Sequence, residues 1–390
     1  MRALRAFAFV SLIGLLAAAC GSEVTSDPDG AAQTPAAPST PPTPVPPDRP
    51  PNVDTSRHSV PLDEVYFDTF DGGAVRLSES TQELRQRLLD AIPPIDAPLY
   101  GEAAAGDWLE PVDLVLGYVA GGTAYAYPFK ILNFHEIVND EIDGTPVLIS
   151  YCPLCGSAIV YDRRVGGEVL SFGNTSALYE SDLVMVDRTT GSYWWQVAGT
   201  AIVGPLTDTE LRALPSVVAT WQGWVSDHPD TLVLTRDTGF DRPYEVDNFA
   251  TYSERIDSGR FAFPVGEEAR DGRLPASTLV VGVVRNGVVR AYPVAGLDTV
   301  VNDVVGGDPL AVIPGDGGVA VFSTVLAGDV VELEIAAGRI VDAATGSEWS
   351  TDGVAISGPL AGSVLEALPA RTTFWFAFVG AFPDVELSTP

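Results

Sequence analysis

The sequence predicts a mainly β fold of the α+β class. Two related β-rich modules, each with a short helix, are expected to pack together after an internal duplication. Alternating apolar runs joined by glycine turns are the first reason, because this pattern is typical of β-hairpins. The second reason is that several sequence blocks occur twice in the chain, in the same order. A repeat kept over roughly 110 residues per copy indicates duplication.

Each copy opens on a hairpin pattern and later carries TGS where a second hairpin would turn. The motifs that both copies keep are best explained by a shared backbone, so residues found only in the first copy are candidates for chemistry. The matching blocks are VLGYVAGGTAYAYPF (115–129) with VVGVVRNGVVRAYPV (280–294), IVNDEIDGTP (137–146) with VVNDVVGGDP (300–309), and DRTTGSYW (187–194) with DAATGSEW (342–349).

The N-terminus predicts export and tethering. In MRALRAFAFVSLIGLLAAAC, arginines precede an apolar run, and LLAAAC resembles a bacterial lipobox in which Cys20 is lipidated. A proline-rich stretch then predicts an extended, disordered linker. The expected segments are a signal peptide (1–19), a tether (20–60), an N-terminal extension (61–111), a first module (112–255), and a second, diverged module without the cysteines and histidines (256–390).

Helices are expected at few places. TQELRQRLLDAI (81–92) has the pattern of an amphipathic helix. After the first AYP, the set Ile131, Phe134, His135 and Val138 falls on one helical face, and the second copy repeats this spacing from Val294 to Val301. The apolar run WFAFVGAF (375–382) is expected to be a buried strand.

Charge excludes several classes of function. A formal net charge of -30 repels phosphate backbones and anionic lipid surfaces, so nucleic-acid binding is not expected. The chain has no phosphate-binding loop, HExxH or GxSxG motif, so no nucleotide cofactor is expected. Whether the protein is an enzyme stays open.

The segment YCPLCGS (151–157) holds Cys152 and Cys155 between two runs rich in β-branched and aromatic residues. This context places the cysteines in a turn between strands, with Pro153 fixing one dihedral angle and Gly156 free to take a positive φ. A thioredoxin-like pair would instead open a helix that lowers a thiol pKa. The turn favours a soft metal such as copper or zinc, but one pair supplies only two ligands.

His135 is the best candidate for a third ligand, because the predicted helix that carries it leads into the cysteine strand. Met185, in the predicted strand SDLVMVD, could add a thioether. The alternatives are a redox-active pair, and a structural disulfide or inert buried thiols, since an exported cysteine pair is oxidised by default. His135 could equally be a hydrogen-bonded core histidine.

Four other residues found only in the first copy are candidates for chemistry, and three of them, Arg188, Trp195 and Gln196, could line a cleft. Arg188 is expected to pair with an acid such as Asp182 or Asp187. His228 is expected to pack at the entry to a strand, because its counterpart in the second copy is Phe382. The four residues are Arg188, Trp195, Gln196 and His228.

The blocks AYPFKILNFHEIVND, ISYCPLCGSAIVYDRR, LYESDLVMVDRTTGSYWWQ, HPDTLVLTRDTG and RPYEVDNFATY resemble the bacterial domain of unknown function 3179 family. The resemblance runs from about Val112 to Tyr252. It departs from the usual pattern at Phe134 and at Tyr193–Trp195. The family's recurrent residues fall on His135, Cys152, Cys155, Arg188 and His228, but the family implies no established activity.

These observations predict a lipoprotein of the bacterial cell envelope that meets the membrane only through its anchor. We expect its first module to bind copper or zinc through Cys152, Cys155 and His135, in a metal-handling or metal-stabilised role. Met185, Arg188 and His228 are possible accessory residues. The alternatives are a thiol-disulfide oxidoreductase of exported proteins and a non-enzymatic surface scaffold. The sequence identifies no protein partner.

Overall fold

Short strands dominate the computed structural model, which describes residues 50–388. Seven sheets contain these strands, and the helices between them are few and short. The mainly β prediction is therefore confirmed. The signal peptide, Cys20 and most of the tether lie outside the described residues. Within the described range, no helix is long and apolar enough to cross a membrane.

The elements fall into two successive groups. Those before residue 258 are β1 (Val65–Asp68), β2 (Ala74–Arg76), η1 (Leu77–Glu79), α1 (Gln82–Leu88), β3 (Tyr100–Glu102), η2 (Ala103–Gly106), β4 (Leu114–Ala120), β5 (Thr123–Pro128), α2 (Phe129–Leu132), β6 (Ile137–Ile142), β7 (Thr145–Cys152), β8 (Ser157–Asp162), β9 (Arg164–Val165), β10 (Glu168–Val169), β11 (Phe172–Tyr179), β12 (Asp182–Asp187), β13 (Tyr193–Trp195), β14 (Thr200–Val203), β15 (Arg212–Leu214), β16 (Val217–Thr220), α3 (Trp221–Asp227), β17 (Leu232–Leu234) and α4 (Tyr252–Asp257). Those after it are η3 (Glu268–Arg270), β18 (Leu279–Arg285), β19 (Val288–Pro293), β20 (Val301–Val305), β21 (Asp308–Gly315), β22 (Gly318–Ser323), β23 (Val325–Leu326), β24 (Asp329–Val330), β25 (Leu333–Ala336), β26 (Arg339–Asp342), β27 (Glu348–Trp349), β28 (Ala355–Ser357), β29 (Arg371–Phe374), α5 (Trp375–Ala381) and β30 (Glu386–Leu387).

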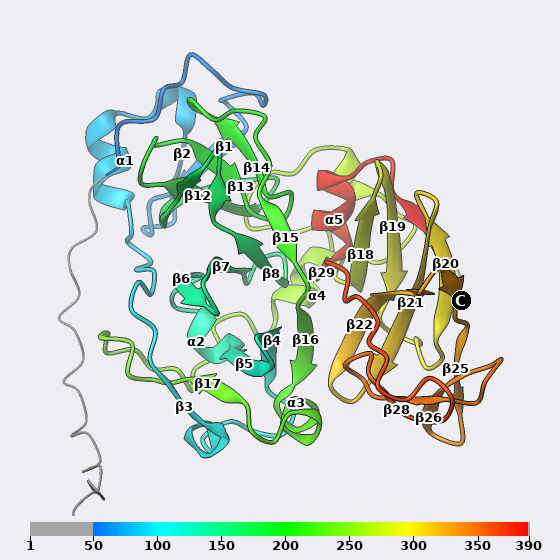
Figure 1. The fold of residues 1–390 in the computed structure, drawn as a ribbon. Coiled ribbons are helices and arrows are strands. Elements are labelled where there is room, and N and C mark those ends of the chain that lie inside the picture. The colour runs from blue at the N-terminus through cyan, green and yellow to red at the C-terminus, as the bar shows by residue number, and fades with distance from the viewer. Residues whose placement is uncertain (1–49, 389–390) are drawn as a thin grey trace, which may run out of the picture. The chain divides into compact units, whose positions relative to one another are not determined.

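One sheet runs through both groups. Its order is β30-β19-β18-β29-β8-β7-β6, and β15 also pairs with β8 (Figure 1). The join is the antiparallel pairing of β29 with β8, at Thr372 and Ala158. A six-stranded sheet, β14-β13-β12-β11-β1-β2, supplies the second layer around the cysteines. The N-terminal extension thus adds β1 and β2 to the edge of a first-module sheet.

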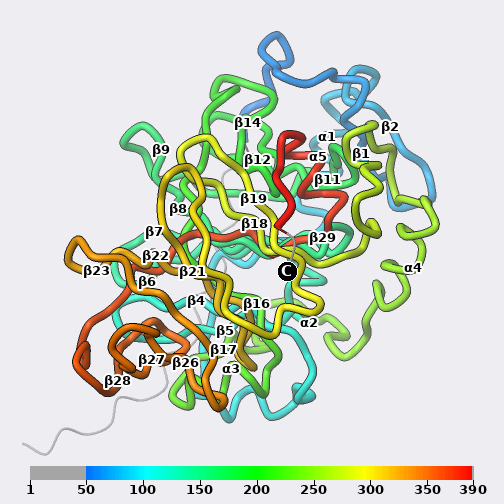
Figure 2. The backbone as a smooth tube through the Cα atoms, turned by 90° about the vertical axis from the view of Figure 1, so that its right-hand side faces the viewer, coloured from blue at the N-terminus to red at the C-terminus, as the bar shows by residue number. Residues whose placement is uncertain are grey.

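The second group ends in smaller sheets. Strands β20, β21 and β22 form one sheet, and β25 to β28 form another. Figure 2 shows β26, β27 and β28 at the same end of the molecule as α3, as Figure 1 does. The two groups of elements therefore approach each other at this end as well as at β8 and β29.

Corresponding positions of the two groups make the same hydrogen bonds. The side chain of Asn139 donates to Phe172 O at 2.8 Å and accepts from the Phe172 N–H at 2.8 Å. Asn302 makes the same two bonds with the backbone of Leu333, at 2.7 and 3.0 Å. The asparagine of the shared VND block therefore ties one sheet to the next in both groups, which gives the motif a structural role.

Local predictions hold where turn and capping residues dictate the backbone. Helix α1 starts after Thr81, whose side chain accepts a hydrogen bond from the Leu84 N–H at 3.1 Å. Such an N-cap satisfies a helix-end donor that has no partner within the helix. Strands β12 and β13 flank the TGS turn, and Trp194 is fully buried.

Two predictions on helices are wrong. The run WFAFVGAF forms helix α5, not a strand, because a short apolar run buried on all sides fits either structure and periodicity cannot separate them. After the first AYP the helix is only α2, Phe129–Leu132. Phe134 and His135 lie in the turn after this helix, and Val138 already lies in β6. After the second AYP the chain reaches β20 without a helix.

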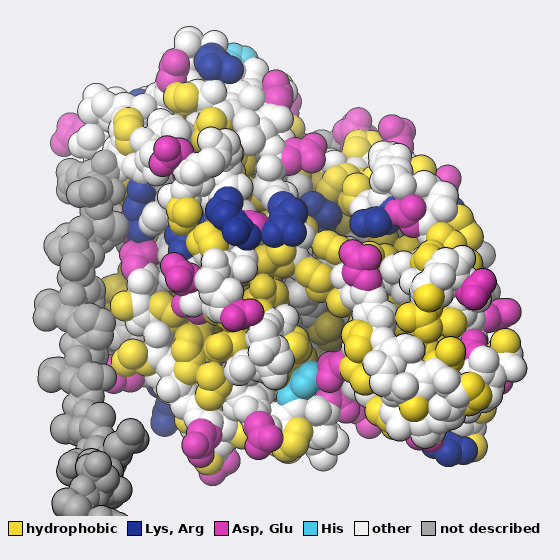
Figure 3. Space-filling model, viewed as in Figure 1, with side chains coloured by type: hydrophobic (Ala, Val, Ile, Leu, Met, Phe, Trp, Pro, Cys, Tyr) yellow, Lys and Arg dark blue, Asp and Glu magenta, His cyan; other side chains and the backbone are white. Residues whose placement is uncertain are grey.

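The packed region begins within the segment assigned to the tether. Val53 is 8% exposed, and the Ser59 N–H donates to Ile202 O at 3.0 Å. His58 is exposed, and its Nδ1 lies 2.9 Å from Val60 O. Residues 50–60 therefore lie against the β13–β14 region. Acidic side chains are scattered over the visible face of the molecule, around a small central group of basic ones (Figure 3).

Candidate functional site

Cys152 and Cys155 lie in a turn between two central strands, as the sequence predicted. Cys152 ends β7, Ser157 begins β8, and the Cys155 N–H donates to Cys152 O at 3.2 Å. Gly156 has a φ of 56°, and a Cβ built there would lie 2.9 Å from the Phe374 ring. Only glycine combines that dihedral angle with so close a neighbour.

Both cysteines are free and buried. Their sulfur atoms are 3.3 Å apart, and the Cys155 thiol lies 3.1 Å from Asp182 Oδ1. Asp182 begins β12 in the second layer, and its Oδ2 accepts a hydrogen bond from the Val197 N–H at 2.8 Å. The backbone of β12 to β14 therefore aims one carboxylate oxygen at the thiol pair.

Three donor atoms gather here at metal-ligand spacing. One atom each from Cys152, Cys155 and Asp182 lies within 4.8 Å of the others, so this group could hold a metal ion. Among residues 50–388, no other set of three histidine, cysteine or acidic side chains meets this spacing. Sequence reasoning considered Asp182 only as a partner of Arg188 and missed its place beside the sulfurs.

Burial dominates the electrostatics of this cluster. It raises the pKa of the Cys152 thiol and raises that of Cys155 more strongly. It also raises the pKa of Asp182 to about 6, although hydrogen bonds from Val197 and the thiols act in the opposite direction. At neutral pH Asp182 is therefore mostly a carboxylate beside two protonated thiols, which makes it the local proton acceptor.

A cavity of about 180 Å³ opens beside Cys152. Glu136, Asn174 and Ser176 supply polar groups to its wall. Burial raises the pKa of Glu136 to about 8, against the lowering effect of a 2.6 Å hydrogen bond from Asn174 Nδ2. Glu136 and Ser176 both have a φ of 59°, a strained conformation for residues other than glycine. Such strain concentrates at functional sites.

His135 lies outside the donor group. Its Nδ1 is 2.7 Å from Pro93 O and its Nε2 is 2.7 Å from the Tyr244 hydroxyl. A carbonyl can only accept, so Nδ1 carries the proton and Nε2 accepts from Tyr244. Burial lowers the pKa of His135 to about 4, which keeps the ring neutral. Both nitrogens are therefore occupied, and the ring anchors Tyr244.

Tyr244 belongs to a covering segment, residues 235–263, whose only helix is α4. Phe249, Ala262 and Phe263 of this segment line the cavity beside Cys152. The Phe263 N–H donates to Ser181 Oγ at 3.3 Å. The covering segment thus forms the outer wall of the cavity, and His135 holds one end of this segment in place.

Met185 and Arg188 were the other accessory candidates. Met185 is fully buried in the same hydrophobic cluster as the cysteines, but three positions after Asp182 in β12 it lies on the opposite face of the strand. The Arg188 guanidinium pairs with Asp96 at 2.9 Å and with Asp90 at 3.3 Å. The expected ion pair with an acid is therefore present, but its acids are Asp90 and Asp96 and not Asp182 or Asp187. Asp187 instead accepts from the Thr190 and Trp194 side chains, which makes it part of the TGS turn.

Gln196 and Trp195 have structural contacts. Gln196 is fully buried below the cysteine turn and joins the two strands that carry it. Its Nε2 donates to Ser150 Oγ at 2.9 Å, and its Oε1 accepts from Ser157 Oγ at 2.5 Å. The Trp195 ring meets Tyr179 edge to face, with centroids 4.8 Å apart. Gln196 thus fixes β7 and β8 relative to each other at the base of the turn.

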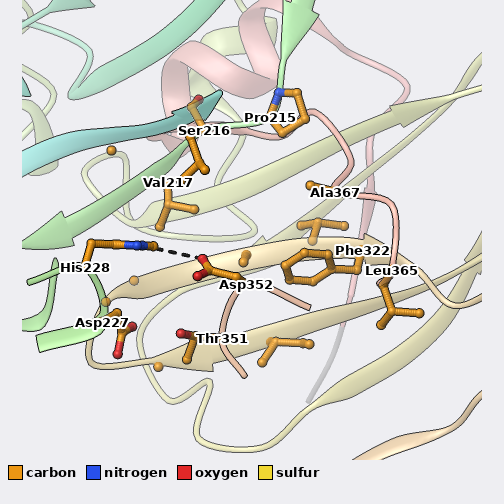
Figure 4. A pocket seen from close by; sticks show the side chains of 18 of the residues that line it. Pro215, Ser216, Val217, Asp227, His228, Phe322, Thr351, Asp352, Leu365 and Ala367 are labelled. Carbon is orange, nitrogen blue, oxygen red and sulfur yellow. Dashed lines mark ion pairs between the residues drawn. The ribbon is translucent and has the colours of Figure 1, made fainter. Parts of the chain in front are cut away.

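His228 lies in a different cavity, of about 250 Å³, lined by residues of both groups of elements. It caps the C-terminus of α3, and its ring centroid is 4.0 Å from that of Trp224. Its Nε2 faces Asp352 Oδ1 at 3.5 Å across this cavity (Figure 4). His228 therefore contributes to packing between the groups and not to the cysteine site.

Two residues that complete the site, Glu136 and Asp182, could have been found by extending the comparison of the repeats. At the offset that aligns His135 with Asp298, Glu136 aligns with Thr299. At the offset that aligns Asp187 with Asp342, Asp182 aligns with Ala337. Both acids are thus specific to the copy that carries the cysteines.

No curated protein and no solved structure matches the chain. A family profile does match, and it extends beyond the resemblance from Val112 to Tyr252 into the second group of elements. The site is accordingly part of a unit that includes both groups. The chain belongs to the family described as Protein of unknown function (DUF3179), whose profile matches residues 89–385.

Proposed function

We propose that the protein is an oxidoreductase in which Cys152 and Cys155 cycle between two thiols and a disulfide. The observation that carries this proposal is the buried contact of the two sulfurs at 3.3 Å, with Asp182 Oδ1 at 3.1 Å from Cys155. A pair this close needs little movement to reach the S–S bond length of about 2.05 Å. A carboxylate beside it can accept the proton that a thiol must lose before it reacts.

The positions of the sulfurs suggest separate roles. Cys152 lines the cavity, whereas Cys155 is fully buried and faces Asp182. Cys152 would attack a small oxidised substrate with an O–O, S–O or S–S bond, and Cys155 would then attack the Cys152 sulfur. The two thiols together give up two electrons and two protons to the substrate, and the protein keeps the disulfide.

A soft metal ion remains the second candidate, because Cys152, Cys155 and Asp182 meet metal-ligand spacing. Copper(I) or zinc would suit two thiolates. The expected third ligand, the His135 imidazole, does not join this group, because both of its nitrogens have other partners. Four-coordinate zinc needs a further donor, and residues 50–388 bring no fourth histidine, cysteine or acid into the group.

Redox titration of the full chain tests the proposal. The protein is equilibrated in thiol–disulfide buffers, and the tryptic peptide 131–163, which holds both cysteines, is examined by mass spectrometry. A reversible disulfide with a potential above about -300 mV supports a catalytic pair, because structural bonds lie below that value. D182N should slow oxidation, with D187N, at the TGS turn, as the matched control.

Metal content is measured on the same preparation by mass spectrometry of the elements. Stoichiometric copper or zinc that disappears in both C152S and C155S would favour the metal candidate. Two cysteines that stay reduced in every buffer until the protein unfolds would overturn the redox proposal.

We also propose that the protein works in the bacterial cell envelope, held by lipidated Cys20. The lipobox and the proline-rich stretch support this placement. An exported protein meets an oxidising compartment, where a dithiol pair must be reduced again after each cycle. Loss of membrane association in C20S, measured by fractionation, is the expected result. The net charge of -30 makes binding to nucleic acid or directly to anionic lipid unfavourable.

An internal duplication is our proposed origin of the two groups of elements. The matching hairpins β4–β5 and β18–β19, and the matching bonds of Asn139 and Asn302, support it. The second group has no cysteine or histidine, so we assign it a supporting role.

A further inference from the structure

We infer that the cavity beside Cys152 is the substrate site, that the Glu136 carboxyl group is its proton donor, and that the substrate is a small uncharged organic hydroperoxide. This inference rests on the proposed dithiol function and adds a substrate class and an acid to it. It is carried by the position of one carboxyl group in a small, mainly apolar cavity that also contains the reactive sulfur.

The size of the cavity limits the substrate. About 180 Å³ is below the ~300–1,000 Å³ of pockets that take drug-sized ligands, so the cavity suits a small substrate better than a peptide. Its wall contains no basic side chain that would hold an anionic group. Apart from Asp68 and the three polar residues named above, the lining is apolar and suits a short hydrocarbon body. The apolar lining residues are Phe70, Ile92, Pro153, Leu154, Ala177, Leu178, Leu183, Phe249, Ala262 and Phe263 together with Cys152.

The hydrogen bonds orient the proton of Glu136. The Asn174 Oδ1 accepts from the Ser176 N–H at 2.7 Å, so the amide group of Asn174 faces Glu136. Its Nδ2 donates to Glu136 Oε2 at 2.6 Å. Among the described residues Oε1 has no hydrogen-bond partner. In the protonated carboxyl group, the proton is therefore placed on Oε1 and is available to a molecule in the cavity.

The leaving group selects the substrate class. A thiolate leaving from a disulfide has a pKa of about 8.5 and needs little help near neutral pH. An alkoxide is far more basic and leaves well only when it is protonated as the bond breaks. A hydroperoxide needs one such proton, and a sulfoxide oxygen needs two to leave as water. One orientated carboxyl group matches the hydroperoxide.

The reaction balances with the residues present. Asp182 takes the Cys155 proton while Cys155 takes that of Cys152, so Cys152 becomes the thiolate. This thiolate attacks the terminal oxygen of ROOH, the O–O bond breaks, and Glu136 protonates the alkoxide to give ROH. Cys152 is then a sulfenic acid. The Cys155 thiol attacks its sulfur, the S–O bond breaks, and water leaves with the Cys155 proton. The proton on Asp182 returns to Glu136 through solvent, so two thiols and ROOH give a disulfide, ROH and water.

The test compares two oxidants on the reduced full chain, with the state of peptide 131–163 as the readout. We expect tert-butyl hydroperoxide to oxidise the wild type faster than hydroxyethyl disulfide does. E136Q should slow the hydroperoxide reaction about 100-fold, the lower range for loss of a general acid. The same variant should change the disulfide reaction less than about threefold, because thiolates leave without an acid. E180Q is the matched control, since Glu180 is a half-buried acid outside the cavity that accepts from the Gly266 N–H at 2.7 Å.

A second variant tests the cavity independently of Glu136. Ile92 is half-buried at the cavity wall, so I92F narrows the space with little disturbance of the core. I92F should slow oxidation of the cysteines by tert-butyl hydroperoxide more than oxidation by the smaller hydrogen peroxide. The inference would be overturned if E136Q slowed oxidation by the hydroperoxide and by the disulfide equally, or if dimethyl sulfoxide oxidised the wild type faster than tert-butyl hydroperoxide does. Either result would leave the proposed dithiol function intact. Failure of every oxidant to form the disulfide would instead remove the proposed function.

Discussion

Replacing Glu136 with glutamine should stabilise the protein at neutral pH while impairing its reaction. Burial raises the pKa of Glu136 from 4.5 to about 8. Between these values the folded state holds a proton that the unfolded chain has released. Stability must therefore fall as the pH rises through this window, because the state that binds more protons is favoured only at lower pH.

The magnitude follows from the two pKa values. Between about pH 5 and about pH 7.5, the linkage relation gives a loss of about 3 kcal/mol of unfolding free energy from this residue. Glutamine resembles the protonated acid in shape, and its amide oxygen can accept the Asn174 hydrogen bond of 2.6 Å. E136Q should therefore keep the stability that the wild type loses over this range.

Urea unfolding of both proteins at about pH 5, 6, 7 and 7.5, with Asp182 present in each, isolates the effect of Glu136. The wild-type curve should fall more steeply with pH, and the difference between the proteins should approach about 3 kcal/mol. Parallel curves would show that Glu136 is ionised in the folded state. That result would remove its assignment as an acid in the cavity.

Four further substitutions test the surroundings of the site. R188M should lower the unfolding free energy by about 3 kcal/mol, because Asp90 and Asp96 lose a buried partner. R164M is the control: its arginine is 49% exposed, so the substitution should lower the unfolding free energy by no more than about 1 kcal/mol. Equal losses in R164M and R188M would refute the assignment of Arg188 as a buried partner of the two acids. Q196L should cost about 2 kcal/mol in urea unfolding, because the buried Ser157 hydroxyl loses its acceptor and Ser150 keeps only its bond to Ile159 O. A neutral effect would contradict this pairing. Burial lowers the pKa of His135 from 6.5 to about 4, so wild-type stability should fall as the pH drops through that window. H135Q should reduce this loss of stability at acid pH and speed proteolysis within residues 235–263. If the unfolding free energy of H135Q falls with pH as steeply as that of the wild type, the assignment of His135 as a buried neutral group is refuted.

The sequence predicts those parts of the fold that local rules determine. Alternation and turn residues identify β7, β8 and the turn that holds both cysteines, and the amphipathic pattern over 81–92 identifies α1, which is shorter than that pattern and ends at Leu88. The eight-residue run at 375–382 was assigned wrongly because burial on all sides removes the periodicity that separates a helix from a strand.

The partners of the cysteines were beyond local rules. Asp182 reaches Cys155 only because β12 lies in a second sheet packed over β7 and β8, a contact between residues 27 positions apart. His135 was chosen because a long helix would have aimed it at the cysteine strand. Helix α2 instead ends at Leu132, and the turn that follows brings His135 to Pro93 and Tyr244. The next residue, Glu136, lines the cavity, so a carboxyl group stands there and the imidazole does not.

The second group of elements has no reactive residue of its own, yet it supports the cysteine turn directly. Cys155 O accepts two hydrogen bonds from β29, from the Phe374 N–H at 2.8 Å and from Thr373 Oγ1 at 3.0 Å. The Phe374 ring packs against Gly156, where no larger residue fits. Any movement of the turn as a disulfide forms must therefore be accommodated at the junction of β8 and β29. The second group, which the family profile also covers as far as residue 385, thus completes the support of the turn that carries the thiols.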